Sequence, residues 1–170
     1  MTINFNQNYF QLFELECSVS VDHELLEKKY LNFQKKLHPD KYVNASDHEK
    51  RLSLQIISYI NGAYETLKND YLKSMYLLKI KGYEIDDQNN TISDPGFLSH
   101  QMELREELEK IFKQNDLKYK EKFSLKINSL KKKSLNEFEK KYSKQMFDDA
   151  MEKIKEMKFY ISIENELKKE

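Results

Sequence analysis

Glycine and proline are scarce in this chain, with three glycines and two prolines in 170 residues. Sandwiches and barrels built from strands need many tight turns, and these two residue types supply most of them. Ten phenylalanines and eleven tyrosines provide enough bulky apolar surface for a packed core, which argues against wholesale disorder. The sequence therefore predicts an all-α protein.

The charges of the chain balance, because 29 lysines and arginines stand against 29 aspartates and glutamates. A net charge of zero argues against a general polyanion binder, whose affinity rests on an excess of basic residues. The run 131–133, three lysines, could indicate nucleic-acid binding, but Glu137 and Glu139 follow it. A solvated helix face is the better interpretation. We expect no nucleic-acid partner.

Cys17 is the one cysteine, so the chain can form neither an internal disulfide nor a cysteine-based zinc site. Free cysteine is most often a small buried hydrophobe, and we expect that of Cys17. The first residues lack the basic region of a signal peptide, and no stretch approaches the roughly 20 apolar residues of a membrane span. We expect a cytoplasmic protein with no membrane partner.

A polar turn cluster divides the chain. Residues 82–96 hold two of the three glycines and one of the two prolines, and residues 86–90 show no periodicity. The sequence therefore predicts an N-terminal domain over residues 1–81, a linker over 82–94 and a C-terminal domain over 95–170.

The N-terminal domain begins with two predicted helices. Tyr9 begins a short one, and Asp22 is placed to cap the second. Pro39 ends the second helix because proline disfavours the helical region in the residue before it. Apolar residues repeat at helical spacing along the second helix: Leu26, Tyr30, Phe33 and Leu37.

Two further helices complete the N-terminal domain. Asp47 is placed to cap the third, and the fourth is expected over residues 70–81. Gly62 inside the third helix costs about 1 kcal/mol relative to alanine, which predicts close packing against a neighbour. The expected core positions of the third helix are Leu52, Ile56, Ile60, Ala63 and Leu67.

The sequence of the C-terminal domain predicts three longer helices in an antiparallel bundle. Ser93 or Asp94 caps the first, with Pro95 near the first helical position. The expected core positions are Phe97, Leu104, Leu108, Ile111 and Phe112 on the first helix, Tyr119, Phe123, Ile127, Leu130, Phe138 and Tyr142 on the second, and Phe147, Ala150, Met151, Ile154, Met157 and Ile161 on the third.

Catalytic constellations are missing from the sequence. The four histidines are scattered without helical pairing, and there is no glycine-rich phosphate loop or nucleophile elbow. We therefore expect neither an enzyme nor a protein with a metal or another cofactor.

A basic face on the second helix leads into a His-Pro-Asp turn. Lys28 and Lys35 lie opposite the apolar stripe on a helical wheel, and Lys29 and Lys36 lie on its flank. The face could be a solvated surface followed by an ordinary proline stop. Its direct continuation into residues 37–41, Leu-His-Pro-Asp-Lys, indicates instead a docking surface for an acidic partner.

Residues 9–68 resemble a J domain, the co-chaperone module that stimulates ATP hydrolysis by heat-shock-cognate chaperones. The resemblance lies in Tyr30, the residues 37–41 and the sequence of residues 60–67, Ile-Asn-Gly-Ala-Tyr-Glu-Thr-Leu. It implies that the turn contacts the chaperone and that nearby lysines steer it by charge. The implied chaperone-binding residues are His38, Pro39, Asp40, Lys41, Lys28, Lys29, Lys35 and Lys36.

The rest of the chain resembles the HscB family of co-chaperones, through residues 76–78, 93–98 and 102–109. The resemblance implies a co-chaperone of iron–sulfur cluster assembly. Such a protein binds the scaffold protein IscU, delivers it to an HscA-type chaperone and stimulates the ATPase of that chaperone. A general J-domain co-chaperone with another client, or a helical adaptor without a chaperone role, are the alternatives.

An apolar patch with acidic neighbours lies off the core of the predicted bundle. Leu98 and Met102 project away from the core face of the first helix, and Phe159 lies opposite the core stripe of the last. Leu98 and Met102 could instead pack against the J domain, with Phe159 an incidental surface aromatic. The resemblance implies a scaffold-binding patch of Leu98, Ser99, Met102, Glu103, Glu106, Lys110 and Phe159.

Two members of this patch depart from the family pattern. Ser99 stands where a larger apolar residue is usual, and Lys110 stands where an acidic residue is usual. Both changes weaken an apolar, acidic surface.

Overall fold

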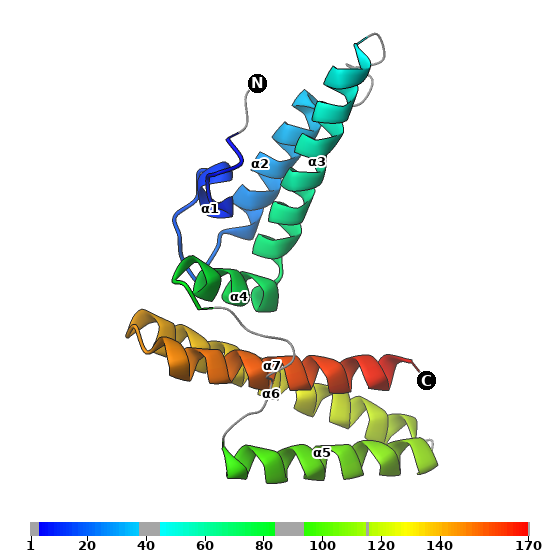
Figure 1. Ribbon diagram of the computed structural model, residues 1–170. Helices are drawn as coiled ribbons and strands as arrows, with labels where there is room; N and C mark the ends of the chain where they lie inside the picture. Colours follow the sequence, from blue (N-terminus) through cyan, green and yellow to red (C-terminus); the bar gives the residue numbers. More distant parts are fainter. Residues whose placement is uncertain (1–3, 38–44, 84–93, 115, 170) are drawn as a thin grey trace. The chain divides into compact units, whose positions relative to one another are not determined.

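The computed structural model describes residues 4–37, 45–83, 94–114 and 116–169. These residues form helices and connecting turns with no strand, so the predicted all-α class is confirmed (Figure 1). The helices are α1 (Tyr9–Leu12), α2 (His23–Lys36), α3 (Asp47–Lys68), α4 (Asp70–Ile80), α5 (Pro95–Gln114), α6 (Leu117–Ser143) and α7 (Phe147–Lys168).

The chain divides into two compact units, Met1–Leu77 and Leu78–Glu170. The division lies inside α4. Most of the sequence assigned to the linker, residues 84–93, lies outside the described residues. The domain boundaries at 81 and 95 therefore stay a prediction.

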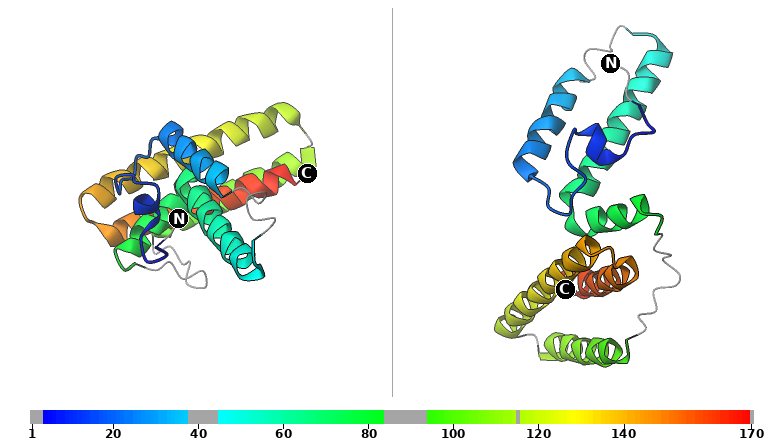
Figure 2. Two further views of the ribbon diagram at one scale, coloured as in Figure 1. Left: turned by 90° about the horizontal axis from the view of Figure 1, so that it is seen from above. Right: turned by 90° about the vertical axis from the view of Figure 1, so that its left-hand side faces the viewer.

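The first unit is built on a hairpin of α2 and α3, with α1 packed against α3 (Figures 1 and 2). The predicted apolar stripe of α2 faces the interior of the unit. Leu26 and Leu37 are buried, and the Tyr30 ring stacks on that of Tyr64 of α3 with 3.9 Å between ring centroids. The stripe predicted on α3 is wrong at Leu52, whose side chain is 43% exposed. The buried residues of α3 are Ser53, Ile56, Ile60, Ala63, Tyr64 and Leu67.

Local capping chemistry sets where α2 and α3 begin. Asp22 caps α2 as predicted, because its carboxylate accepts a hydrogen bond from the Leu25 N–H at 3.0 Å. The predicted cap of α3 at Asp47 is wrong, since Ser46 occupies that position. Ser46 and Glu49 exchange hydrogen bonds in a capping box, which satisfies two backbone N–H groups at once.

Two expectations of burial in the first unit are also wrong. Cys17 is exposed, because it lies in the connection between α1 and α2 rather than on a core-facing stripe. Gly62 is exposed on α3, and no atom lies within 4 Å of the position that a Cβ would take. The glycine therefore does not mark a close approach of a neighbouring element.

Gly62→Ala is expected to stabilise the protein. An alanine side chain meets open space there, and it removes the conformational entropy that glycine carries in the unfolded chain. We expect the free energy of unfolding to rise by about 1 kcal/mol in urea denaturation. A drop would show that the site needs glycine for a reason that the packing does not reveal.

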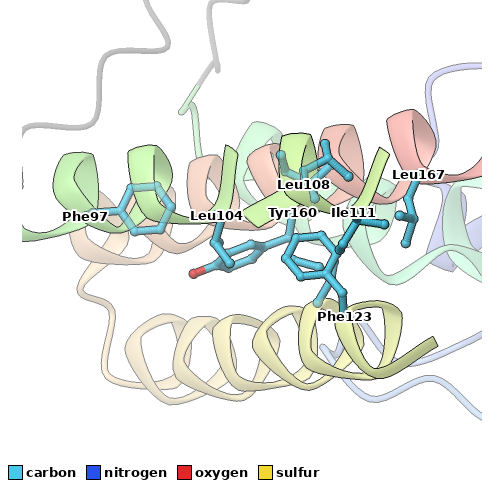
Figure 3. Packing of buried hydrophobic residues seen from close by; sticks show 9 residues of the cluster. Phe97, Leu104, Leu108, Ile111, Phe123, Tyr160 and Leu167 are labelled. Carbon is cyan, nitrogen blue, oxygen red and sulfur yellow. The ribbon is translucent and has the colours of Figure 1, made fainter. Parts of the chain in front are cut away.

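The second unit contains α5, α6 and α7, of which α6 and α7 form a long hairpin and α5 packs against both. Residues of α5 and α6 that were predicted to face the core do so, among them Phe97, Leu104 and Phe123 (Figure 3). Asp94 caps α5, since its carboxylate accepts from the Gly96 N–H at 3.0 Å. The central cluster consists of Phe97, Leu104, Leu108, Ile111, Phe123, Ile127, Tyr160, Ile163 and Leu167.

The C-terminal half of α7 buries a different face from the predicted one. Ile161 is predicted on the core face, but Tyr160 and Ile163 are buried in its place. Ala150 and Ile154 are buried outside the central cluster, in the N-terminal half of α7. Because α5 joins the packing only in the C-terminal half, the buried stripe turns around α7 along its length.

Glu164 ties α7 to α6 by accepting a hydrogen bond from the ammonium group of Lys131, and it accepts a second one from Lys168 of its own helix. These bonds hold the pKa of the Glu164 carboxyl below its ordinary value of 4.5. The lysine run 131–133 is therefore partly engaged inside the fold, through Lys131, while Lys132 and Lys133 are exposed.

Glu164→Gln is expected to make the stability less sensitive to acid. A carboxyl with a lowered pKa stabilises the fold above its unfolded value of 4.5, and this contribution is lost as the pH falls through the folded value. Between about pH 6 and pH 3, the free energy of unfolding should therefore fall less in the variant than in wild type. Parallel pH profiles in urea denaturation would contradict the assignment.

Candidate partner-binding surfaces

The outer face of α2 carries the predicted basic surface. Lys28, Lys35 and Lys36 are exposed, and no carboxylate of the described residues lies within ion-pair distance of them. Two leucines that the sequence reasoning passed over, Leu25 and Leu31, are 39% and 48% exposed on the same helix. They line a shallow hollow together with Lys28 and Lys35. The face can therefore offer apolar contact as well as charge.

Lys29 differs from the other lysines of α2. Its ammonium group donates to the Glu14 carbonyl oxygen at 3.1 Å and to the Glu14 carboxylate at 3.0 Å. Glu14 has a φ of 49°, so the chain between α1 and α2 turns sharply where Lys29 holds it. Lys29 therefore fastens this connection, and its charge is less available to a partner than that of Lys28.

The His-Pro-Asp turn itself, His38 to Asp40, and the neighbouring Lys41 lie outside the described residues. The described chain leads up to it: α2 ends at Lys36, and the Leu37 N–H bonds to the Phe33 carbonyl at 2.9 Å. Leu37 is buried, which fixes the end of the helix at the point where the turn begins in the sequence.

The outer face of α5 carries the second predicted surface. Leu98 is 45% exposed and Met102 is 66% exposed, so both project off the core as predicted. Glu103 lies beside His100, with 3.6 Å between the His100 Nδ1 and the carboxylate. The remaining predicted residues of this helix are also exposed: Ser99, Glu106 and Lys110.

Phe159 lies on α7 and is partly buried against the central cluster, so the predicted position opposite the core is wrong. Its ring contacts Phe97 edge to face, with 5.9 Å between centroids. The Arg105 guanidinium lies over the same ring at 5.6 Å and pairs with Glu166 at 3.8 Å. Phe159 is thus at the edge of the contact between α5 and α7, beside the residue that precedes Leu98.

Arg105 is absent from the sequence-based set. It comes near Phe159 through the packing of α5 on α7, which no spacing within one helix reveals. Its cation covers one face of the aromatic ring and leaves a mixed apolar and charged surface around Leu98 and Phe159.

The two surfaces differ in charge and in polarity. Within the described ranges, no group of three or more His, Cys, Asp and Glu side chains is arranged to hold a metal ion. None of the helices described is long and apolar enough to cross a bilayer. The first unit carries a basic face on α2, and the second unit carries an apolar, partly acidic face on α5.

Comparison with known proteins covers both units. Residues 93–168 match the family model described as the HSCB C-terminal oligomerisation domain. The co-chaperone protein HscB homologue of Aliivibrio salmonicida is 33% identical over 163 residues, which cover 95% of each chain. The chaperone HscB from Vibrio cholerae has a similar structure, with a TM-score of 0.84, 31% identity and 96% of each chain covered.

The crystal structure of the human co-chaperone protein HscB is also similar, with a TM-score of 0.91 and 26% identity. The likeness covers 99% of this chain and 84% of the human one. The similarity to bacterial relatives runs through almost the whole chain at more than 30% identity. The protein therefore belongs to the HscB family of co-chaperones.

Proposed function

We propose that this protein is a cytoplasmic co-chaperone of iron–sulfur cluster assembly. It binds the scaffold protein IscU, delivers it to an HscA-type chaperone and stimulates the ATPase of that chaperone. The observation that carries the proposal is that the likeness to HscB co-chaperones extends over 95% of the chain and so includes both surfaces. Hydrolysis takes place in the chaperone, and this chain is not itself an enzyme.

The chaperone meets the first unit in this proposal. Lys28, Lys35 and Lys36 supply exposed positive charge along α2, which speeds encounter with an acidic surface. The His-Pro-Asp turn then makes the specific contact, with the Asp40 carboxylate accepting from a basic group of the chaperone. Because the steering charges are exposed, the association should weaken as the salt concentration rises.

The scaffold meets the second unit. Leu98 and Met102 are exposed apolar side chains that the bundle core does not use, and such a patch is a common partner site. Glu103 and Glu106 add negative charge beside them, and Phe159 extends the apolar surface across to α7.

Ser99 and Lys110 reduce the apolar and acidic character of the patch relative to the family pattern, which calls for a matching change on the scaffold.

Calorimetric titration with IscU from the same organism tests the proposed client. We expect saturable one-to-one binding to the full chain. A titration with no heat of binding would contradict the scaffold role and favour a general co-chaperone with another client. In that case Ser99 and Lys110 are the first positions to restore, through Ser99→Leu and Lys110→Glu.

A further inference from the structure

Asn61 joins α3 to α2 through a single oxygen atom. The side-chain carbonyl of Asn61 accepts a hydrogen bond from the Tyr30 hydroxyl at 3.2 Å and another from the Gln34 amide at 2.7 Å. Both side-chain hydrogen bonds that cross from α2 to α3 in the described residues therefore end on this atom. A carbonyl oxygen has two acceptor sites, so both are used.

The two donors lie one helical turn apart on α2. Side chains at i and i+4 share a face of a helix, so Tyr30 and Gln34 donate to the Asn61 oxygen from successive turns of α2. Apolar packing alone resists separation of two helices better than it resists rotation of one about its axis, because it lacks direction. Two directional bonds to one point hold α2 against such rotation.

The rotational setting of α2 decides where its lysines point. Lys35 and Lys36 follow Gln34 directly and are exposed, and the His-Pro-Asp turn comes next in the sequence. At a helix radius of about 5 to 6 Å, a rotation of about 20° moves a surface group by roughly 2 Å. That displacement exceeds what a hydrogen-bonded docking contact tolerates.

We propose that Asn61 is a positioning residue that sets the orientation of the chaperone-binding face of α2. The inference rests on the proposed function, because it concerns the same surface. Asn61 belongs to the sequence of residues 60–67 that resembles the J domain, and its side chain does not need to touch the chaperone. It acts through Tyr30 and Gln34.

Two substitutions separate the acceptor role of Asn61 from its size. Asn61→Leu keeps the branched side-chain skeleton and removes the acceptor, while Asn61→Asp keeps an oxygen that accepts from both donors, with a stronger charge-assisted bond. The Tyr30–Tyr64 ring stack and the buried Leu26 remain in both variants, so the hairpin keeps its apolar contacts.

The experiment measures the ATPase rate of the HscA-type chaperone against the concentration of each full-length variant. For Asn61→Leu we expect the half-maximal concentration to rise about tenfold while the maximal rate stays the same. Asn61→Asp should match wild type, and the affinity for IscU should be unchanged in both. Gln34→Leu removes one donor from the α2 side and should produce part of the same rise.

The outcomes distinguish this inference from the proposed function. A wild-type protein that leaves the ATPase rate unchanged would overturn the proposed function and this inference with it. A stimulating wild type with an unchanged half-maximal concentration in Asn61→Leu would overturn the inference alone. If Asn61→Leu loses its helical circular dichroism, it has failed to fold, and Gln34→Leu then serves as the test variant. An unchanged half-maximal concentration in Gln34→Leu overturns the inference.

Discussion

Asp40→Asn is expected to abolish stimulation of the chaperone ATPase while leaving the affinity for the scaffold unchanged. Asparagine keeps the size of the side chain and removes its charge, so the basic group on the chaperone loses its partner. Truncating one side of a close interfacial charge pair costs about 2 to 5 kcal/mol, which corresponds to at least a thirtyfold loss of affinity. His38→Gln should likewise lower the stimulation of the chaperone ATPase and leave the affinity for the scaffold unchanged. The ATPase rate and a calorimetric titration with IscU measure the two activities separately.

Asp47→Asn provides the matched control. Asp47 is exposed in the first turn of α3, where its loss removes the same charge from the same unit. Stimulation should stay at the wild-type level in this variant. A similar loss in both variants would show that net charge, and not the His-Pro-Asp turn, governs the interaction.

The double substitution Leu98→Ala and Met102→Ala is expected to weaken scaffold binding and spare ATPase stimulation. Both side chains are largely exposed, so their truncation leaves the bundle core intact. Loss of two apolar contacts at the centre of an interface costs about 2 kcal/mol or more, a weakening of roughly thirtyfold or greater. Phe159 is less suited to this test, since its ring also packs on Phe97 and its removal would disturb the fold.

A pair of exposed leucines elsewhere on the same unit serves as the control. Leu117 and Leu125 of α6 are 76% and 65% exposed, comparable with Met102. Leu117→Ala with Leu125→Ala should bind IscU with the wild-type affinity. Equal weakening by the two double variants would mean that the surface of α5 is not the specific site.

The arrangement of α5 could be predicted from the sequence because one periodicity governs the whole helix. Phe97, Leu104 and Leu108 repeat on one face and meet the same neighbours along its length, so the wheel places Leu98 and Met102 outside. The wheel fails for α7, whose neighbours change partway along. For that reason the predicted position of Phe159 is wrong.

Contacts between helices account for the other missed features of the surfaces. The pairing of Lys29 with Glu14 depends on the turn after α1, and the position of Arg105 over Phe159 depends on how α5 meets α7. Neither follows from spacing within one element. The lysines of α2 therefore look equivalent in the sequence, although Lys29 already pairs with Glu14.

Errors in local structure have simpler causes. Ser46 and Asp47 are both good capping residues, and the glutamate three positions after Ser46 decides between them through the capping box. The predictions for Gly62 and Cys17 rest on the usual behaviour of their residue types, which the local structure overrides at individual positions.

The steady-state ATPase rate of an HscA-type chaperone, measured with and without this protein, tests the central claim most directly. The proposed function predicts a rate that rises with the concentration of the protein and saturates, with the effect weakened by salt and lost in Asp40→Asn. A rate that stays at the basal level at every concentration, with IscU present or absent, would contradict it.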